Sequence, residues 1–211
     1  MNSNFHKQLQ WRYATKQFDK TKKVSDSDMN DIIESNRLAP SSYGLQPWKL
    51  VMVKDEKLRQ KLRENAYDQP QVTDASHFFV ICARTDVNEA YVKGYIKLIA
   101  DTRGQAAEQL KGYEDMMLNW RKNLSDEGVL DWSKRQAYIG LGFLLYTCAL
   151  KGIDACPMEG FDNNKFNEIL DLNKEHLASV AMCAVGYRSA DDKYAQAKKV
   201  RFDAKDLVVV K

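Results

Sequence analysis

Two uninterrupted apolar segments place the strongest constraint on how this chain can fold. They read HFFVICA at residues 77–83 and LASVAMCAVGY at residues 177–187. A short continuous apolar run is typical of a strand that is buried on both faces of a sheet. The segments around these runs carry helical patterns, so the sequence predicts an α+β fold in which helices cover a central sheet.

The first part of the chain contains two helical segments and a loop. A short helix is expected at residues 3–10, and a longer one begins at the capping-box-like pair Ser25 and Asp28 and ends near Pro40. Its apolar face consists of Met29, Ile32, Ile33 and Leu38. The following stretch PSSYGLQPW, residues 40–48, has two prolines, two serines and a glycine, so it is predicted to be a loop.

Two more helices are expected further along the chain. One occupies residues 55–66, and the strongest in the sequence spans residues 132–151 and ends at Gly152. The apolar face of the second consists of Ala137, Leu141, Leu144, Leu145 and Cys148. Residues 86–123 are helix-permissive but weakly patterned, and we interpret them as a partly exposed helical excursion or lid.

Two further strands complete the expected sheet. KLVMV, at residues 49–53, follows the loop, and a short strand begins the stretch IDACPMEGFD at residues 153–162. This strand ends in a turn, after which Asp162 is placed to cap a helix that runs through Leu170.

Length and charge limit the class of protein. A chain of 211 residues is expected to form one domain over residues 1–211, because single domains extend to about 250 residues. Its 32 basic and 29 acidic residues are interspersed and give a net charge of +3, so it lacks the broad cationic field of a nucleic-acid binder. The chain shows neither an export signal nor an apolar run of about 18 residues, which predicts a cytoplasmic protein that does not cross a membrane.

The sequence shows no metal-binding or nucleophile constellation. The four cysteines lie far apart in apolar surroundings without zinc-site spacing, which predicts buried, reduced thiols. The three histidines are also far apart, and none is flanked by Ser or Cys in a way that suggests a catalytic triad. A nucleophile supplied by the protein alone is therefore not expected. The basic and polar loops instead favour a site for a large, planar, phosphorylated ligand that brings its own chemistry.

Each polar stretch also has a plain structural interpretation. Arg12 and Lys16 in RYATKQFD can be solvated cations, and Ser42 and Gln46 can cap their own loop. PMEGFD can simply start the next helix, and the cations at 198–201 can belong to a solvated tail. The combination favours the ligand site, because four separate basic or polar loops occur together with glycine-containing turns at strand ends.

Five segments in this order resemble the signature of the FMN-dependent nitroreductase family, close to its oxygen-insensitive NAD(P)H nitroreductase and dihydropteridine reductase type. They are RYATKQFD, APSSYGLQPWKLVMV, DASHFFVICA, PMEGFD and AKKVRF, and they span nearly the whole chain. The resemblance implies a nitroreductase-like fold with a central mixed β-sheet flanked by helices. It also implies an intertwined homodimer with two FMN molecules at the interface, each held by both chains. The C-terminal strand, which contains LVVV at residues 207–210, is then exchanged onto the partner's sheet.

The resemblance assigns four cations to FMN. Arg12 lies at the 5′-phosphate, where Lys199 and Arg201 add two more charges, and Lys16 reaches the pyrimidine edge of the ring. Arg suits a phosphate dianion because its planar guanidinium donates two hydrogen bonds, while Lys supplies a compact charge. Lys16 is also suited to stabilise the negative charge that reduction places near N1 and O2 of the ring.

Other segments complete the implied FMN site. The further contacts are Tyr13, Ala14, Pro40, Ser41, Ser42, Gln46, Asn65, Pro157, Met158, Glu159 and Gly160. The loop that contains Ser41 and Ser42 reaches the partner's flavin, Gln46 lies near the ring, and Asn65 lies at the pyrimidine edge. The backbone N–H groups of Glu159 and Gly160 point at N5 and O4, so no side chain is assigned as catalytic.

Three positions depart from the family pattern. Relatives often carry Ser or Thr where this chain has Ala14, and Thr15 is the candidate to replace that hydroxyl at the phosphate. Relatives of the enterobacterial type have Asn where Gly44 stands, and Tyr43 replaces a smaller residue beside the ring. The bulk of Tyr43 leaves the substrate specificity open.

The activity implied by the resemblance is that of an oxidoreductase with two half-reactions at one site. NADH or NADPH gives hydride to flavin N5, and a nitroaromatic, quinone or pteridine acceptor then takes two electrons. One alternative is a flavin-binding storage or regulatory protein without turnover, in which Tyr43, Tyr113 and Trp120 close the flavin face. Another is an interaction domain with no cofactor. The sequence leaves the physiological acceptor and the choice between NADH and NADPH open.

Overall fold

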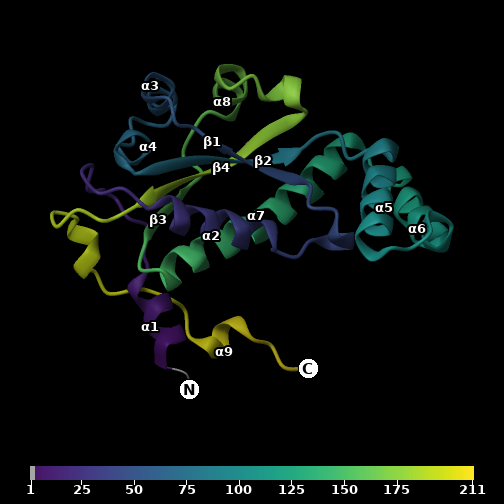
Figure 1. The fold of residues 1–211 in the computed structure, drawn as a ribbon. Coiled ribbons are helices and arrows are strands. Elements are labelled where there is room, and N and C mark those ends of the chain that lie inside the picture. The colour runs from purple at the N-terminus through teal and green to yellow at the C-terminus, as the bar shows by residue number, and fades with distance from the viewer. Residues whose placement is uncertain (1–2) are drawn as a thin grey trace.

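A computed structural model describes residues 3–211, which form nine α-helices and four β-strands (Figure 1). The helices are α1 Ser3–Trp11, α2 Asp26–Arg37, α3 Glu56–Glu64, α4 Gln71–Asp74, α5 Glu89–Arg103, α6 Lys111–Lys122, α7 Asp126–Leu150, α8 Asn163–Ile169 and α9 Ala204–Leu207. The strands are β1 Trp48–Met52, β2 His77–Arg84, β3 Asp154–Met158 and β4 Leu177–Gly186. Both apolar runs are strands, and the predicted α+β architecture is confirmed.

The four strands form one sheet in the order β1-β2-β4-β3, in which every pairing is antiparallel. Within residues 3–211, parallel pairing is limited to an isolated bridge between Ala14 and Ala155 on the outer edge of β3. A mixed sheet was expected, and in the single chain this bridge is its one parallel pairing among the described residues. Since Ala14 covers the edge of β3, the open edge of the sheet is β1.

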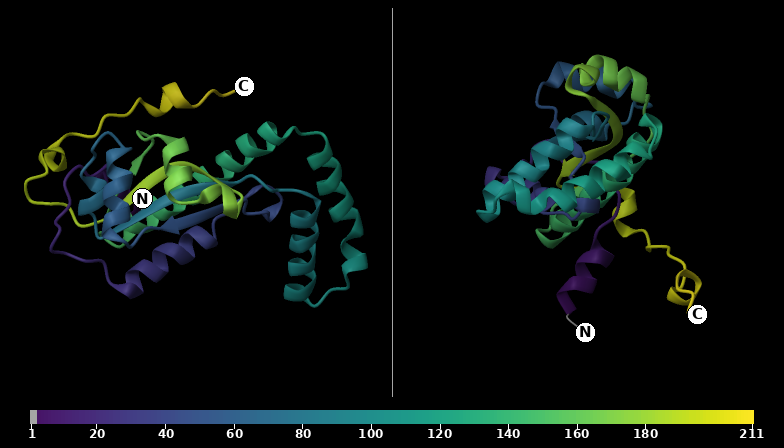
Figure 2. Two further views of the ribbon diagram at one scale, coloured as in Figure 1. Left: turned by 90° about the horizontal axis from the view of Figure 1, so that it is seen from above. Right: turned by 90° about the vertical axis from the view of Figure 1, so that its right-hand side faces the viewer.

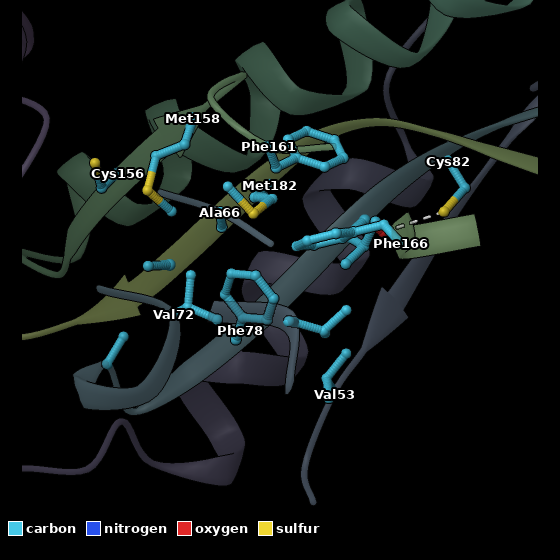
Figure 3. Close-up of a cluster of buried hydrophobic side chains, with 14 of the residues drawn as sticks. Val53, Ala66, Val72, Phe78, Cys82, Cys156, Met158, Phe161, Phe166 and Met182 are labelled. Atoms are coloured by element: carbon cyan, nitrogen blue, oxygen red, sulfur yellow. Dashed lines mark hydrogen bonds between the residues drawn. The ribbon is translucent and has the colours of Figure 1, made fainter. Parts of the chain in front are cut away.

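Helices cover both faces of this sheet. The helices α3, α4 and α8 pack on one face, and α2 and α7 pack on the other (Figure 1). Successive residues of a strand point to opposite faces, so Phe78 and Val80 enter the first core while Phe79 and Ile81 enter the second. Figure 3 shows the first core, where the rings of Phe161 and Phe166 lie 4.5 Å apart between centroids. Burial on both faces explains why β2 is apolar without interruption.

Two helix predictions differ from the structure at their ends. The longest helix begins at Asp126 rather than at residue 132, because Ser125 caps it by accepting a hydrogen bond from the Gly128 N–H at 3.1 Å. The apolar residues of its early turns, Val129 and Trp132, pack in a different core from Ala137, so they do not extend the predicted apolar face. Leu38 was expected on the apolar face of α2, but α2 ends at Arg37 and the Leu38 side chain is 63% exposed.

Residues 86–123 form a pair of helices that projects from the sheet, as Figure 2 shows for the teal segment at the right of its left-hand view. We call residues 89–122, which contain α5 and α6, the α5–α6 hairpin. The predicted helical excursion is confirmed. It has a core of its own, formed by Leu45, Val87, Val92, Ile96, Ile99, Met117, Val129 and Trp132. The weak apolar pattern is explained by α6, in which Met117 is the one buried residue.

All four cysteines are buried and free of disulfides, as predicted. Burial raises the pKa of the Cys82 and Cys148 thiols to about 12, so neither is a thiolate at neutral pH. In the part of the chain that the structure describes, every helix is too short or too polar to span a bilayer.

The C-terminal segment leaves the body of the molecule. In the right-hand view of Figure 2 the yellow tail and α1 both project away from the sheet. The side chains of Leu207, Val208, Val209 and Val210 are between 62% and 88% exposed. The predicted exchange of this segment onto a partner's sheet stays a prediction, because it concerns a second chain.

Candidate functional site

The irregular segment RYATKQFD is held in place by a carboxylate from the far end of the chain. Oδ2 of Asp192 accepts hydrogen bonds from the Lys16 N–H at 2.8 Å, the Gln17 N–H at 3.1 Å and the Tyr13 hydroxyl at 2.9 Å. Asp192 is buried. A helix in this position could not direct these three donors at one oxygen atom, which explains why the backbone is irregular here.

A second buried carboxylate fixes the other side of the same segment. Asp154 accepts from Arg188 Nε at 2.9 Å and Nη2 at 2.6 Å, and from the Thr15 hydroxyl at 3.3 Å. The Arg188 guanidinium also lies 4.2 Å from the centre of the Trp11 ring. Thr15 is fully buried by these contacts, so the expectation that its hydroxyl replaces the family's phosphate contact is wrong.

Sequence reasoning missed Asp154, Asp192 and Arg188. Of these three residues, only Asp154 could have been noticed in the sequence. An acidic residue at the start of a buried strand needs a partner for its charge. Its partner Arg188 lies 34 residues away, and Asp192 acts across more than 170 residues, so no local pattern reveals either contact.

The two ends of the chain meet in a pocket of about 330 Å³, which we call the cation pocket. Six of the predicted FMN contacts line it, namely Arg12, Tyr13, Ala14, Lys16, Lys199 and Arg201. Lys199 Nζ donates a hydrogen bond to the Arg12 carbonyl, which fixes the tail against the first segment. Tyr194 also lines this pocket and was not predicted.

The charges in the cation pocket are not neutralised by the protein. Among the ion pairs found in the described part of the chain, none includes Arg12, Lys16, Lys199 or Arg201. Burial and the neighbouring Arg201 lower the pKa of Arg12, and burial together with Arg12 and Arg201 lowers the pKa of Lys199. The neighbouring positive charges of the cation pocket repel one another, so a bound anion would stabilise the pocket.

The turn after β3 presents two backbone donors. The N–H groups of Glu159 and Gly160 have no acceptor within residues 3–211. Gln69 Nε2 donates to the Gly160 carbonyl at 2.8 Å, and the Asp162 N–H donates to the Asn65 carbonyl at 2.9 Å, so a second loop holds the turn. The two N–H groups are therefore available as donors, and their use by a flavin stays a prediction.

Two amide side chains from the region of α3 and α4 differ in their hydrogen bonds. The Asn65 Nδ2 donates to the Lys61 carbonyl at 3.0 Å, at the end of its own helix. Gln71 is 4% exposed, and its Oε1 has no partner in the described residues. Burial raises the pKa of the Cys156 thiol, whereas the charge of Lys16 and a hydrogen bond from Gln71 lower it. Sequence reasoning missed Gln71, because an amide oxygen that is buried without a partner is visible only in the fold.

The loop at residues 40–48 does not reach the cation pocket of its own chain. It lies beside the α5–α6 hairpin, at the opposite end of the sheet from α1 and the tail (Figure 1). Ser41 Oγ accepts from the Gln46 N–H at 2.9 Å, and the Ser42 N–H donates to Gln136 Oε1 at 2.8 Å. Gln46 Nε2 donates to the Arg37 carbonyl. The expectation that Ser42 and Gln46 cap their own loop is wrong in detail, because Ser41 caps the loop and the Gln46 side chain bonds to α2 instead. Contact of this loop with the flavin of a partner stays a prediction.

Gly44 gives a test of this loop. Its φ is +74°, and a Cβ atom at this position would lie 2.1 Å from the Tyr95 hydroxyl oxygen. We expect Gly44→Ala to lower the free energy of unfolding by about 1–3 kcal/mol, because it adds a strained left-handed residue and a clash. Urea unfolding of the FMN-free protein measures this. Gly112→Ala is the control, since a Cβ there meets nothing within 4 Å; equal stability of both variants would contradict this loop conformation.

Comparison with solved structures defines the class of fold. A protein from Bacillus subtilis classed as a nitroreductase matches with a TM-score of 0.89 at 20% identity, over 100% of both chains. A Staphylococcus epidermidis protein classed as an NAD(P)H:FMN oxidoreductase matches with a TM-score of 0.86 at 25% identity, over 98% of this chain and 95% of that chain. A nitroreductase from Exiguobacterium sibiricum, solved in complex with FMN, gives 0.83 at 20% identity, over 98% and 97%. The architecture is the nitroreductase fold.

Comparison with related sequences shows the family to which the chain belongs. The model of the Nitroreductase family matches residues 9–187. A Staphylococcus haemolyticus protein classed as an NAD(P)H nitroreductase is 39% identical over 206 residues, which is 94% of this chain and 93% of that protein. The Bacillus subtilis protein YfkO, of the same class, is 38% identical over 209 residues, again 94% and 93%. The chain belongs to the nitroreductase family, as the resemblance in its sequence implied.

Proposed function

We propose that this protein is an NAD(P)H-dependent FMN oxidoreductase that reduces nitroaromatic, quinone or related acceptors in two half-reactions. The observation that carries the proposal is the cation pocket, where five cations from the two ends of the chain gather and none forms an ion pair with a described residue. These cations are Arg12, Lys16, Lys198, Lys199 and Arg201. A phosphate monoester is the small anion that suits such a cluster. The names of the relatives and the FMN complex of one structural neighbour support the same reading.

The residues around the pocket fit FMN. Arg12, Lys199 and Arg201 would hold the phosphate, and Lys16, which lines the same pocket, would reach the pyrimidine edge of the ring. The free N–H groups of Glu159 and Gly160 then donate to the ring atoms near the hydride position. FMN, when bound, supplies the transfer of hydride from NAD(P)H and of two electrons to the acceptor. The protein orients the ring and sets its electrostatic surroundings.

A homodimer with shared sites completes this arrangement. The loop at residues 40–48 lies at the opposite end of the sheet from the cation pocket of its own chain, so we propose that it serves the site of a partner. The open edge of β1 and an adjacent groove of about 680 Å³, lined by Ile33, Leu45, Leu50 and Leu98 among others, suit the exposed apolar tail of a second copy. An unpaired strand edge and an exposed apolar tail are both hazards for a monomer.

The rival storage function needs aromatic side chains that are free to cover the flavin. Tyr43 instead packs against Tyr113 and Trp120 of the α5–α6 hairpin, with its ring centre 5.2 Å from that of Trp120 and 6.5 Å from that of Tyr113. Their half-buried positions favour an open flavin face and hence turnover.

Initial-rate kinetics test the proposed mechanism. With FMN-loaded protein, we expect parallel double-reciprocal lines when NADPH or NADH is varied at several fixed concentrations of a quinone, because the donor leaves before the acceptor binds. Intersecting lines would show that both substrates bind together and would overturn the two-step mechanism. Absence of turnover with every acceptor class would favour the storage function.

Glu159→Gln should leave hydride transfer nearly unchanged, within about threefold. The group used there is the backbone N–H, and the carboxylate already accepts a hydrogen bond from the Tyr138 hydroxyl, a contact that Gln Oε1 can also accept. Anaerobic stopped-flow reduction of the flavin measures the effect. A loss of more than about a hundredfold, typical of an acid or base, would show that the side chain takes part in the chemistry.

A further inference from the structure

The loop at residues 40–48 has an unusual backbone that needs support from elsewhere. Tyr43, Gly44 and Gln46 have φ values of +58°, +74° and +46°, all in the left-handed region. Residues other than glycine avoid this region, so a free peptide of this sequence would rarely adopt the loop's backbone conformation. The conformation persists only if contacts around the loop select it.

Two tyrosine hydroxyls from the α5–α6 hairpin provide such contacts. The Tyr113 hydroxyl, on α6, donates to the Tyr43 carbonyl at 2.9 Å. The Tyr91 hydroxyl, on α5, donates to the Leu45 carbonyl at 2.8 Å. The two accepting carbonyls flank Gly44, in the middle of the left-handed stretch. One helix of the hairpin therefore holds each side of the loop.

The hairpin and the loop share a core as well. Leu45 is 2% exposed and packs with Val92, Ile96 and other residues of the hairpin core, and the Tyr43 ring contacts Trp120. The hydrogen bonds are thus made in partly buried surroundings, where a well-placed hydroxyl fixes a carbonyl more firmly than water does. No described residue other than the tyrosines Tyr91 and Tyr113 donates a side-chain hydrogen bond to the carbonyls of residues 43–45.

We propose that Tyr91 and Tyr113 are positioning residues for the flavin site of the partner subunit, although neither touches the flavin. They hold the loop in the left-handed shape that directs Ser41 and Ser42 toward the partner's FMN. This inference rests on the proposed function, in which that loop serves the partner. It assigns the α5–α6 hairpin a role in cofactor binding at a site built mainly from another chain.

FMN titration of single variants gives the first test. We expect Tyr91→Phe and Tyr113→Phe each to raise the Kd for FMN about 2- to 10-fold, the effect of one lost hydrogen bond, and more in the double variant. Tyr95→Phe is the matched control, because its hydroxyl also lies against the loop but makes no hydrogen bond in the described residues. Equal Kd values for all four variants and the parent would overturn the proposal.

Mixed dimers separate positioning from a general loss of stability. One subunit carries Tyr91→Phe with Tyr113→Phe, the other carries Arg12→Ala, and two different affinity tags allow the mixed dimer to be purified after co-expression. If the tyrosines act on the partner's site, one site in this dimer combines an intact cation pocket with an intact loop and binds FMN with the parent's Kd. The second site has both defects and binds weakly.

The outcomes are distinct. One tight site per mixed dimer, with two weakened sites in each variant homodimer, supports the proposal. Two weakened sites would overturn it, because the tyrosines would then act within their own chain or through its overall stability. If the parent protein itself fails to bind FMN, the proposed function fails first, and this inference falls with it.

Discussion

Replacing Arg12 or Arg201 by alanine is expected to weaken FMN binding about 10- to 150-fold, since each removes a charge-assisted hydrogen bond of about 1.5–3 kcal/mol. Titration of FMN-free protein, followed by quenching of flavin fluorescence, measures the Kd. Arg103→Ala, an exposed arginine in the last turn of α5, is the control and should leave the Kd unchanged.

The same two substitutions, which weaken FMN binding, are not expected to destabilise the protein when FMN is absent. Arg12 and Lys199 have lowered pKa values partly because like charges surround them, so removing Arg201 or Arg12 relieves repulsion in the empty pocket. The melting temperature of the FMN-free variants should therefore not fall below that of the parent. Unchanged FMN affinity, or a clear loss of stability without FMN, would show that these cations are structural.

Deleting residues 206–211 is expected to disrupt the dimer. The truncation removes the exposed apolar segment Leu207–Val210, and with it the ladder hydrogen bonds and apolar burial that we propose it provides at the partner's β1 edge. Obligate dimers often have no stable folded monomer, so we expect a lower melting temperature, weaker FMN binding and aggregation. Lys199 and Arg201 remain in the chain but are held less firmly.

Size-exclusion chromatography with light scattering measures this second effect. Deletion of Lys211 alone is the control, because it removes one exposed charged residue and leaves the apolar segment intact. An unchanged dimer after the longer truncation would contradict strand exchange. A full-length protein that retains FMN as a monomer would contradict the shared site as a whole.

The sheet could be predicted from the sequence because its signals are local. β2 is apolar from Phe78 to Ala83, since neighbouring residues such as Phe78 and Phe79 enter different cores, and β4 is interrupted only by Ser179 before its final Gly186. The start of α7 could not, because Val129 and Trp132 in its early turns pack in the hairpin core and do not extend the apolar face that begins at Ala137. Leu38 had the spacing of a core residue, but the helix ends one residue before it.

Part of the candidate site could likewise be predicted from the sequence, and part of it could not. The resemblance located the cations of the pocket, and the fold brings Arg12 and Lys16 together with Lys199 and Arg201 across more than 180 residues. Asp154, Asp192 and Gln71 were missed. Their roles depend on hydrogen bonds or burial between distant segments, and neither periodicity nor spacing carries that information.

Anaerobic reduction of the bound flavin tests the central claim most directly. Protein saturated with FMN and freed of excess cofactor is mixed under nitrogen with NADH or NADPH, alongside free FMN and an Arg12→Ala, Arg201→Ala variant as controls. We predict one FMN per chain, bleaching of its yellow absorption by about one equivalent of the nicotinamide per chain, and return of the colour when a quinone or nitroaromatic is added. A yellow protein that neither nicotinamide bleaches would contradict the oxidoreductase function, and a protein that retains no FMN would contradict the cofactor itself.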